Sequence, residues 1–237
     1  MHFLTTILRN RQCIAVIVAG LFVFSAGVQA QEKSVPKDKK EKTGYALGTN
    51  IGRDMKNFAI EIDGDMVAQG IKDAQAGKIV LSDEELRTVL TDLNKEMQTK
   101  QTEKMKVLAE KNKREGETFL KENEKKKGVI KLPSGLQYKV MKEGTGKTPN
   151  ATDMVAVHYK GTLIDGTEFD SSLKRNQPAE FKVNAVIPGW TEILQKMKAG
   201  SKYTVFIPTN LAYGEKGAGP IGPNAVLIFD IELISVK

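Results

Sequence analysis

Residues that could bind a metal ion or act as a nucleophile are scarce in this sequence of 237 residues. It holds two histidines and one cysteine, and only His158 among them lies beyond the first 30 residues. A zinc site needs more ligands of these types, and a serine–histidine–aspartate triad would have to use His158 in the middle of a strand-like segment. The GTGK stretch around Gly144 lacks the spacing of a phosphate-binding loop. We therefore expect no metal, no cofactor and no covalent intermediate.

The side chains that remain as binding-site candidates are aromatic and apolar. Residues 129–237 hold most of the glycine, proline, aromatic and β-branched residues, and one notable acid, Asp170, directly follows Phe169. An isolated aromatic residue usually belongs to the hydrophobic core. Residue types alone leave open whether these aromatic residues form a core or line a pocket.

Alternation of apolar and polar residues predicts the strands that would carry these side chains, because a period of two is typical of a strand with one buried face. Asp165-Gly166 is typical of a hairpin turn. Pro188 opens a short helical stretch, which Gly200 ends. These elements predict an α+β domain, a twisted antiparallel sheet with one short helix. The alternating segments are residues 136–141, 155–160 and 227–233.

Residues 43–127 favour helices, since they are rich in Lys, Glu, Gln, Met, Leu and Ala. A first helix is expected around Tyr45 to Met55, and a second between the N-cap Asp63 and Gly77. Each glycine in a helix costs about 1 kcal/mol relative to alanine. The glycines of the first helix therefore suggest close approach to another helix; they are Gly44, Gly48 and Gly52.

A long third helix is predicted from the capping box formed by Ser82 and Glu85. No strong helix breaker follows before Gly128, so the helix would reach roughly 65 Å. Beyond Gln98 apolar residues become rare and i,i+4 ion pairs common, which is typical of a solvated bridge between domains. Binding of nucleic acid or anionic lipid by this cationic stretch is the alternative. The apolar residues of its first third are Leu86, Val89, Leu90, Leu93 and Met97.

The helical segments cannot bury much apolar surface alone, because small units rarely form a core. We therefore expect residues 43–100 to pair with a second copy of the chain, and packing against the C-terminal domain is the alternative. The expected parts are a signal peptide (1–30), a flexible leader (31–42), a helical dimerisation domain (43–100), the linker part of the long helix (101–127) and the sheet domain (128–237).

The first 30 residues carry the features of a secretory signal. Arg9 and Arg11 precede an apolar run from Cys13 to Phe24, and small residues lead to a cleavage site after Ala30. The run is short for a membrane span, although an uncleaved anchor is the alternative. Cleavage would remove the sole cysteine and lower the formal charge from +7 to about +5. We therefore expect an exported protein without a stable membrane span. Its mildly basic charge gives no strong indication of nucleic-acid binding.

Four segments of the C-terminal part resemble, in order, the signature segments of FKBP-type prolyl isomerases. The helical part resembles the dimeric, exported branch of that family, which includes the macrophage infectivity potentiator proteins and their periplasmic relatives. GYALGTNIGRDMKNF and FLKENEKKKGVIKLPSGLQYKV carry this second similarity. The four signature segments are VHYKGTLIDGTEFDSS (157–172), VIPGWTEIL (186–194), IPTNLAYG (207–214) and LIFDIELISV (227–236).

The resemblance implies a peptidyl-prolyl cis–trans isomerase with an apolar proline pocket, in which Trp190 is the floor and the Tyr213 hydroxyl faces a substrate carbonyl. Asp170 either faces the amide or serves as a structural partner of Tyr159 or Arg175. Ala179 and a short Glu215–Asn224 loop depart from the eukaryotic single-domain pattern and leave macrolide affinity open. The implied catalytic residues are Asp170, Tyr213 and Tyr159, and the implied substrate-binding residues are Phe169, Phe181, Val186, Ile187, Trp190, Ile221 and Phe229.

The implied function is assistance to the folding of exported proteins in the periplasm or at the outer-membrane surface of a Gram-negative bacterium. The partners would be proline-containing or unfolded polypeptides and a second copy of the chain, with macrolides as possible inhibitors. The alternative is a dimeric holdase chaperone or host-interaction factor in which the isomerase activity is incidental.

Overall fold

The computed structural model describes residues 35–237, and the predicted signal peptide lies outside this range. Within this range the boundary between two compact units falls between Ile51 and Gly52. Helix α1 (Lys39–Asn57) begins inside the segment that was expected to be a flexible leader. The reason is local, because the Asp38 carboxylate accepts a hydrogen bond from the backbone N–H of Glu41 and so caps the helix.

Helix α2 (Gly64–Ala76) has the boundaries that its sequence predicts. The Asp63 side chain accepts hydrogen bonds from the backbone N–H groups of Asp65 and Met66, at 2.9 and 3.1 Å. At the other end, Gly77 adopts φ 68°, a left-handed conformation that glycine reaches without strain. Both the N-cap and the stop are therefore confirmed.

Helix α3 (Asp83–Asn123) begins with the predicted capping box, in which Ser82 and Glu85 bond each other's backbone N–H groups. It ends at Asn123, before the expected Gly128. Asn123 is buried, and its amide donates to the Gln137 side chain at 3.0 Å. This contact fixes the last helical turn against the sheet, and the chain then turns through Glu124–Lys127 into the first strand.

The second half of α3 is not solvated on every side, contrary to our expectation for a bridge. Within residues 52–237 one face of it packs against the sheet domain. Gly116 and Asn123 are buried there, and the ring centroids of Phe119 and Phe206 lie 5.9 Å apart. The partly or fully buried positions follow helical spacing, at residues 105, 108, 109, 112, 116, 119, 120 and 123.

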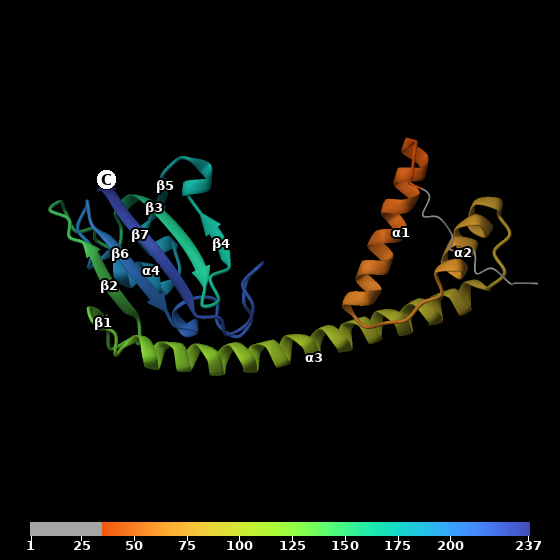
Figure 1. Cartoon of the computed structure of the whole chain (residues 1–237), viewed down its shortest axis with the longest axis horizontal. Helices are drawn as coiled ribbons and strands as arrows, with labels where there is room; N and C mark the ends of the chain where they lie inside the picture. The colour runs from red at the N-terminus through yellow and green to blue at the C-terminus, as the bar shows by residue number, and fades with distance from the viewer. Residues whose placement is uncertain (1–34) are drawn as a thin grey trace, which may run out of the picture. The chain divides into compact units, whose positions relative to one another are not determined.

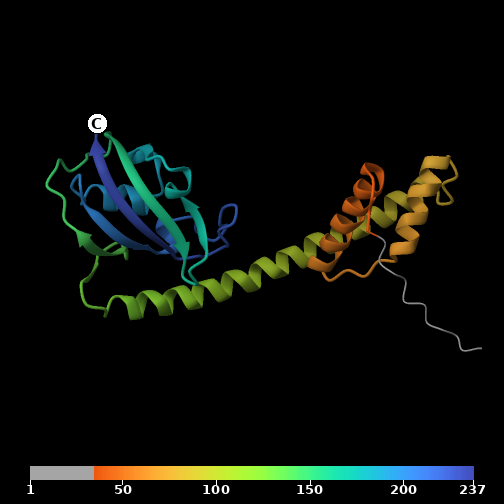
Figure 2. The same ribbon diagram turned by 45° about the horizontal axis from the view of Figure 1, so that its top comes forward.

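The sheet is antiparallel, as the alternation predicts, with the strand order β1-β2-β6-β7-β3-β4 and β5 paired to β3 (Figure 1). Helix α4 (Pro188–Leu194) packs against one face of it (Figure 2). The main core lies between this face and α4, and α3 packs against the sheet at Phe206. The strands are β1 (Val129–Lys131), β2 (Gln137–Lys142), β3 (Met154–Leu163), β4 (Glu168–Ser171), β5 (Ala179–Lys182), β6 (Lys202–Ile207) and β7 (Leu227–Val236).

Short 3-10 helices join some of these strands, and the predicted turn at Asp165-Gly166 joins β3 to β4. There the Leu163 N–H donates to the Thr167 carbonyl at 2.9 Å, and Gly166 adopts φ 86°. The 3-10 helices are η1 (Leu173–Arg175), η2 (Val183–Ala185) and η3 (Thr209–Leu211).

No helix within residues 35–237 is long and apolar enough to cross a membrane.

Candidate functional site

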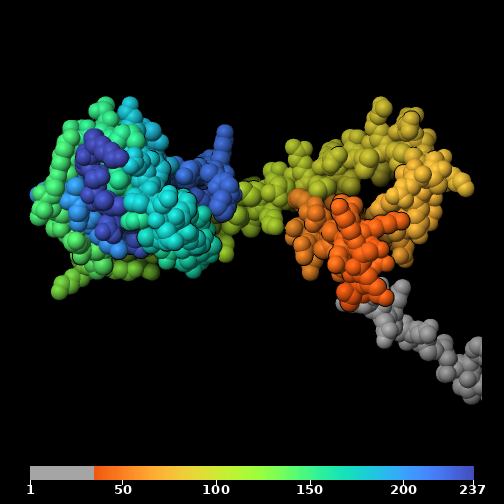
Figure 3. Space-filling model, turned by 90° about the horizontal axis from the view of Figure 1, so that it is seen from above, coloured from red at the N-terminus to blue at the C-terminus, as the bar shows by residue number. Residues whose placement is uncertain are grey.

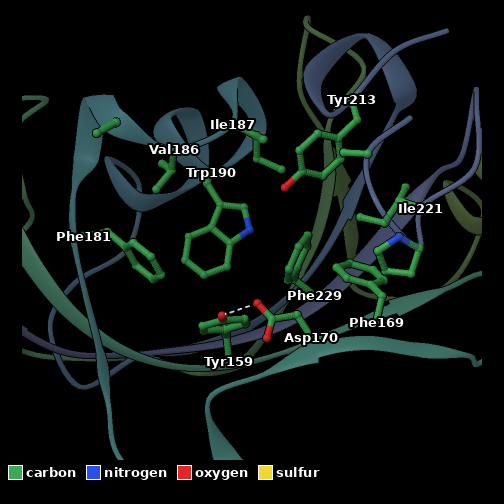
Figure 4. A pocket seen from close by; sticks show the side chains of 13 residues that line it. Tyr159, Phe169, Asp170, Phe181, Val186, Ile187, Trp190, Tyr213, Ile221 and Phe229 are labelled. Carbon is green, nitrogen blue, oxygen red and sulfur yellow. Dashed lines mark hydrogen bonds between the residues drawn. The ribbon is translucent and has the colours of Figure 1, made fainter. Parts of the chain in front are cut away.

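A cavity of about 690 Å³ opens at one end of the sheet, beside α4. Its lining is mostly aromatic and aliphatic, with one carboxylate at the rim (Figure 4). The ten side chains expected from the sequence all lie in this lining, although they come from separate strands, helices and loops. The cavity is lined by Tyr159, Phe169, Asp170, Phe181, Ala185, Val186, Ile187, Trp190, Tyr213, Ala218, Pro220, Ile221 and Phe229.

Trp190 forms the centre of the aromatic lining, and its side chain is 3% exposed. It meets the rings of Tyr159, Phe181 and Phe229 edge to face, with centroid distances of 5.2, 5.7 and 5.2 Å. Such edge-to-face pairs add about 0.5–1.5 kcal/mol each beyond the burial of their area. The floor of the cavity is therefore a rigid aromatic cluster.

Local sequence places Trp190 at this position. Pro188 occupies the first turn of α4, where its missing N–H costs nothing. At Gly189 an added Cβ would lie 2.5 Å from the Ile207 side chain, so only glycine lets α4 approach the sheet this closely. The helix start therefore directs the indole toward the cavity.

Gly161 of β3 opens the space between two aromatic walls. It pairs with Phe229 of β7 on one side and with Asp170 of β4 on the other. An added Cβ would lie 2.6 Å from the Phe169 ring and 2.8 Å from the Phe229 ring. The two rings consequently meet edge to face directly above this glycine, with centroids 5.5 Å apart.

Asp170 stands in a hydrogen-bonded network at the rim. The Tyr159 hydroxyl donates to its Oδ2 at 2.5 Å, and the Arg175 guanidinium donates to its Oδ1 at 3.0 Å. The Ser171 backbone N–H also donates to Oδ1, at 2.8 Å. Arg175 further donates to the Tyr159 hydroxyl at 3.0 Å. The three side chains therefore orient one another.

The network shifts two ionisation equilibria. Burial, and then the hydrogen bond to Asp170, raise the pKa of Tyr159. Burial alone would raise the pKa of Asp170, but the hydrogen bonds from Tyr159, Arg175 and Ser171 outweigh it and lower that pKa. At neutral pH the site therefore holds a neutral phenol bonded to a carboxylate.

Tyr213 lies on the opposite side of the cavity mouth and is 40% exposed. Its hydroxyl points into the opening (Figure 4). Among the described residues this hydroxyl has no hydrogen-bond partner, so it remains available to a ligand.

The structure also adds residues that the sequence did not single out for the site. Ala185, Ala218 and Pro220 contribute to the lining, and Gly161 makes room for it. Small residues and a loop proline carry no pattern of their own, so periodicity could not have found them. The steric need for Gly161 appears only once Phe169 and Phe229 are side by side.

No group of three or more metal-binding side chains is found within residues 35–237. Apolar walls, one phenol–carboxylate pair and one free hydroxyl suit the binding of an extended, weakly polar ligand such as a peptide.

Two sequence models match the chain. The family described as FKBP-type peptidyl-prolyl cis-trans isomerase matches residues 145–234. The domain described as amino terminal to FKBP-type peptidyl-prolyl isomerase matches residues 40–140. Together the two matches cover both the helical part and the sheet domain.

Relatives agree with these matches. The chain is 45% identical over 226 residues to the outer membrane protein MIP of Legionella longbeachae, covering 94% of this chain and 97% of the relative. It is 38% identical over 245 residues to the FKBP-type peptidyl-prolyl cis-trans isomerase FkpA of Escherichia coli, covering 99% of this chain and 91% of the relative.

Solved structures show the same similarity. The crystal structure of FkpA from Escherichia coli superimposes with a TM-score of 0.66 at 40% identity, covering 86% of this chain and 99% of that one. A peptidyl-prolyl cis-trans isomerase from Pseudomonas syringae superimposes with a TM-score of 0.51 at 41% identity, covering 54% of this chain and 96% of that one.

The chain belongs to the FKBP-type peptidyl-prolyl cis–trans isomerase family. It is an enzyme of that class, and its helical N-terminal part and antiparallel sheet match the fold of its structural relative.

Proposed function

We propose that the cavity around Trp190 binds an X–Pro peptide and lowers the barrier to rotation about its amide bond. The observation that carries this proposal is the convergence of ten side chains, predicted from separate sequence segments, on one apolar cavity of about 690 Å³. Rotation about the amide bond requires no nucleophile, so a cavity that binds the peptide is sufficient for an isomerase.

The physical basis is differential binding. Amide rotation has a barrier of about 18–20 kcal/mol, because the planar amide is stabilised by resonance. The twisted amide has lost that resonance and is less polar, so it prefers a drier site than the planar form does. A cavity that binds the twisted form more tightly than either planar isomer accelerates exchange. Each tenfold gain in rate requires about 1.4 kcal/mol of such preference.

Roles for the three polar groups follow from their positions. The Tyr213 hydroxyl, which points into the opening, donates a hydrogen bond to a substrate carbonyl. Tyr159 forms part of the wall, and Asp170 holds it there through the 2.5 Å hydrogen bond. Three of the lone pairs of the carboxylate accept hydrogen bonds from the protein, which favours this holding role for Asp170 over direct contact with the amide.

The experiment is a measurement of cis–trans exchange in a short X–Pro peptide by NMR, with the parent and with Tyr159→Phe. This substitution removes the hydroxyl that bonds Asp170 and leaves the ring in the wall. We expect exchange well above the uncatalysed rate in the parent, and a reduction of about fivefold in the variant, as for the loss of one hydrogen bond of about 1 kcal/mol.

Tyr138→Phe is the matched control. Tyr138 is stacked on Tyr203 at a centroid distance of 5.5 Å and does not line the cavity. It should therefore exchange the peptide as the parent does. If the folded parent leaves the exchange rate at its uncatalysed value, the proposed function is wrong.

We further propose that the chain is exported, that it forms a dimer through residues 43–100, and that it assists the folding of exported proteins. Apolar side chains exposed in the helical part support the dimer. Tyr45 and Leu47 of α1 and Leu90 of α3 are more than half exposed. At Gly44, Gly48 and Gly52 an added Cβ would meet nothing within 4 Å in the described chain. A second copy that packs closely on these glycines would cover the exposed residues.

A holdase chaperone remains the second candidate, because the same exposed apolar residues could contact an unfolded client. Removal of the helical part distinguishes the two functions. The cut belongs before Met105, since the rest of α3 packs on the sheet domain. Normal peptide exchange with lost protection of an unfolded protein would assign the chaperone function to residues 35–104. Equal protection by the shortened chain would exclude that assignment.

A further inference from the structure

The loop between η3 and β7, residues 213–226, forms one wall of the cavity. At its tip Ala218 and Ile221 exchange two backbone hydrogen bonds of 2.9 Å, with Gly219 and Pro220 between them. Ala218, Pro220 and Ile221 all line the cavity. Any movement of this tip therefore changes the width of the cavity, while Trp190 stays fixed in the core.

The loop meets the core of the sheet domain through Ile221, which is 6% exposed, whereas Ala218, Gly219 and Pro220 at the tip are exposed. The loop closes on its own base, because the Gly214 N–H donates to the Thr209 carbonyl and the Asn224 N–H to the Gly214 carbonyl. Behind the tip lies a groove of about 520 Å³, bordered on its far side by Met105, Leu108 and Asn112 of α3. Ala218, Gly219 and Pro220 line this groove, so their support from α3 comes through the residues that follow them in the loop.

Helix α3 supplies those contacts through two side-chain amides. Asn112 of the helix donates to the Pro223 carbonyl of the loop at 2.8 Å. In return, Asn224 of the loop donates to the Ala109 carbonyl of the helix at 3.3 Å. The two bonds tie adjacent loop residues to adjacent turns of the helix, and they join residues more than a hundred positions apart in the sequence.

Close steric contact accompanies these bonds. An added Cβ at Gly222 would lie 3.1 Å from the Leu108 side chain and 3.2 Å from the Asn112 amide. An added Cβ at Gly116 would lie 2.7 Å from the Val226 side chain. The loop and this part of α3 are in contact in the space-filling view, where blue atoms touch the yellow-green helix (Figure 3).

We propose that Asn112 is a positioning residue of the isomerase, which with Asn224 fixes the Ala218–Ile221 wall and thereby selects among residues that precede proline in the substrate. The proposal rests on the proposed function of the cavity. The floor and the Tyr159 wall are held by the core, whereas the loop wall is held by Ile221 in the core and, from behind, by α3. Loss of the helix contact should therefore change substrate binding and discrimination more than turnover.

The first test compares Asn112→Ala and Asn224→Gly with the parent, as full chains. Asn224 adopts φ 55°, a conformation that glycine shares, so Asn224→Gly removes the amide without straining the backbone. A panel of peptides that differ only in the residue before proline is measured. We expect KM to rise about fivefold for the best substrate, since each variant loses a hydrogen bond of about 1 kcal/mol. The differences in KM among the peptides should become smaller, and kcat should change by less than about twofold.

Asn123→Ala is the control for a purely structural effect. It removes an amide from the same face of the same helix, but its partner is Gln137, outside the loop. This variant should be less stable than the parent and yet rank the peptides as the parent does. If Asn123→Ala alters the ranking as Asn112→Ala does, the effect is general loosening and the proposal is overturned.

A second measurement does not depend on activity. Hydrogen exchange of the Ala218 and Ile221 amides should be faster in Asn112→Ala and Asn224→Gly than in the parent or Asn123→Ala. Unchanged exchange would overturn the positioning role even if the parent proved inactive. Faster exchange with an unchanged peptide ranking in an active parent would overturn the selection of substrates.

Discussion

The two halves of α3 differ in burial, and the difference is the opposite of what their compositions suggest. The first half carries apolar residues, and several of them, including Val89 and Leu90, are more than half exposed in the described chain. The second half is rich in charge, and yet Gly116 and Asn123 are buried against the sheet domain. Burial in a helix therefore depends on whether small residues and amides find matching partners, and not only on an apolar stripe.

Gly116→Leu should have the largest effect, because it disrupts the packing of the second half of α3 on the sheet domain. The Cβ alone would lie 2.7 Å from the Val226 side chain, which is β-branched and cannot move aside easily. We expect a loss of about 3 kcal/mol in the free energy of unfolding, at the upper end for overpacking. Urea unfolding followed by near-ultraviolet circular dichroism measures it. Gly70→Leu in α2, where an added Cβ meets nothing within 4 Å in the described chain, should cost the sheet domain nothing.

Asn123→Ala, compared with Asn94→Ala in the first half, sharpens the contrast between equal residues on one helix. Asn123 is 1% exposed, and its loss leaves the Gln137 carbonyl oxygen buried without its donor. We expect a cost of about 2 kcal/mol, as for a buried unsatisfied group. Asn94 is exposed, so its substitution should change the free energy of unfolding by less than about 0.5 kcal/mol. Equal costs in the two variants would contradict the comparison.

Leu90→Asp tests whether the exposed apolar residues of the first half are covered by a second copy. A charge in a buried interface should raise the dissociation constant of the dimer at least about tenfold, which corresponds to about 1.4 kcal/mol. Sedimentation over a range of concentrations measures this constant. Lys106→Asp, an exposed position in the second half, is the control. Unchanged association in Leu90→Asp would exclude this face from the interface.

The smallest expected effect is that of pH. The pKa of Tyr159 is raised, so its neutral form persists until the pH rises through that value; the pKa of Asp170 is lowered, so its charge is lost only as the pH falls through it. Both shifts move the titration of these two groups away from neutral pH. The side-chain amides of Asn112 and Asn224, which hold the loop, do not titrate. We expect a constant kcat/KM between about pH 5 and 9, the interval between the ordinary carboxyl and phenol values. A change of more than about twofold within that interval would contradict this assignment.

Local rules were sufficient for the helix boundaries that depend on neighbouring residues. The Ser82–Glu85 capping box, the Asp63 N-cap and the Gly77 stop each involve groups a few positions apart, and the structure confirms them. The end of α3 at Asn123 was missed, because it depends on Gln137, which lies beyond the next turn of the chain.

The face of α3 that packs on the sheet domain has a periodic sequence pattern that composition alone does not reveal. Met105, Leu108, Asn112, Gly116 and Phe119 recur at intervals of three or four residues. Because two of them are not apolar, a search for apolar periodicity treats the segment as polar.

The cavity residues were predicted from the sequence by resemblance to the family, since no periodicity links side chains from different strands and loops. The positions of Asp170, Tyr159 and Tyr213 in the lining follow from the fold.

Trp190 is the sole tryptophan in the chain, and it lies at the floor of the cavity. Its fluorescence is therefore a built-in optical reporter of one site. A peptide that enters the cavity should alter the emission without any label, because it packs against the indole at the floor. A client that contacts only the helical part should leave the emission unchanged. Titrations of a single unmodified protein can thus separate the two modes of client binding.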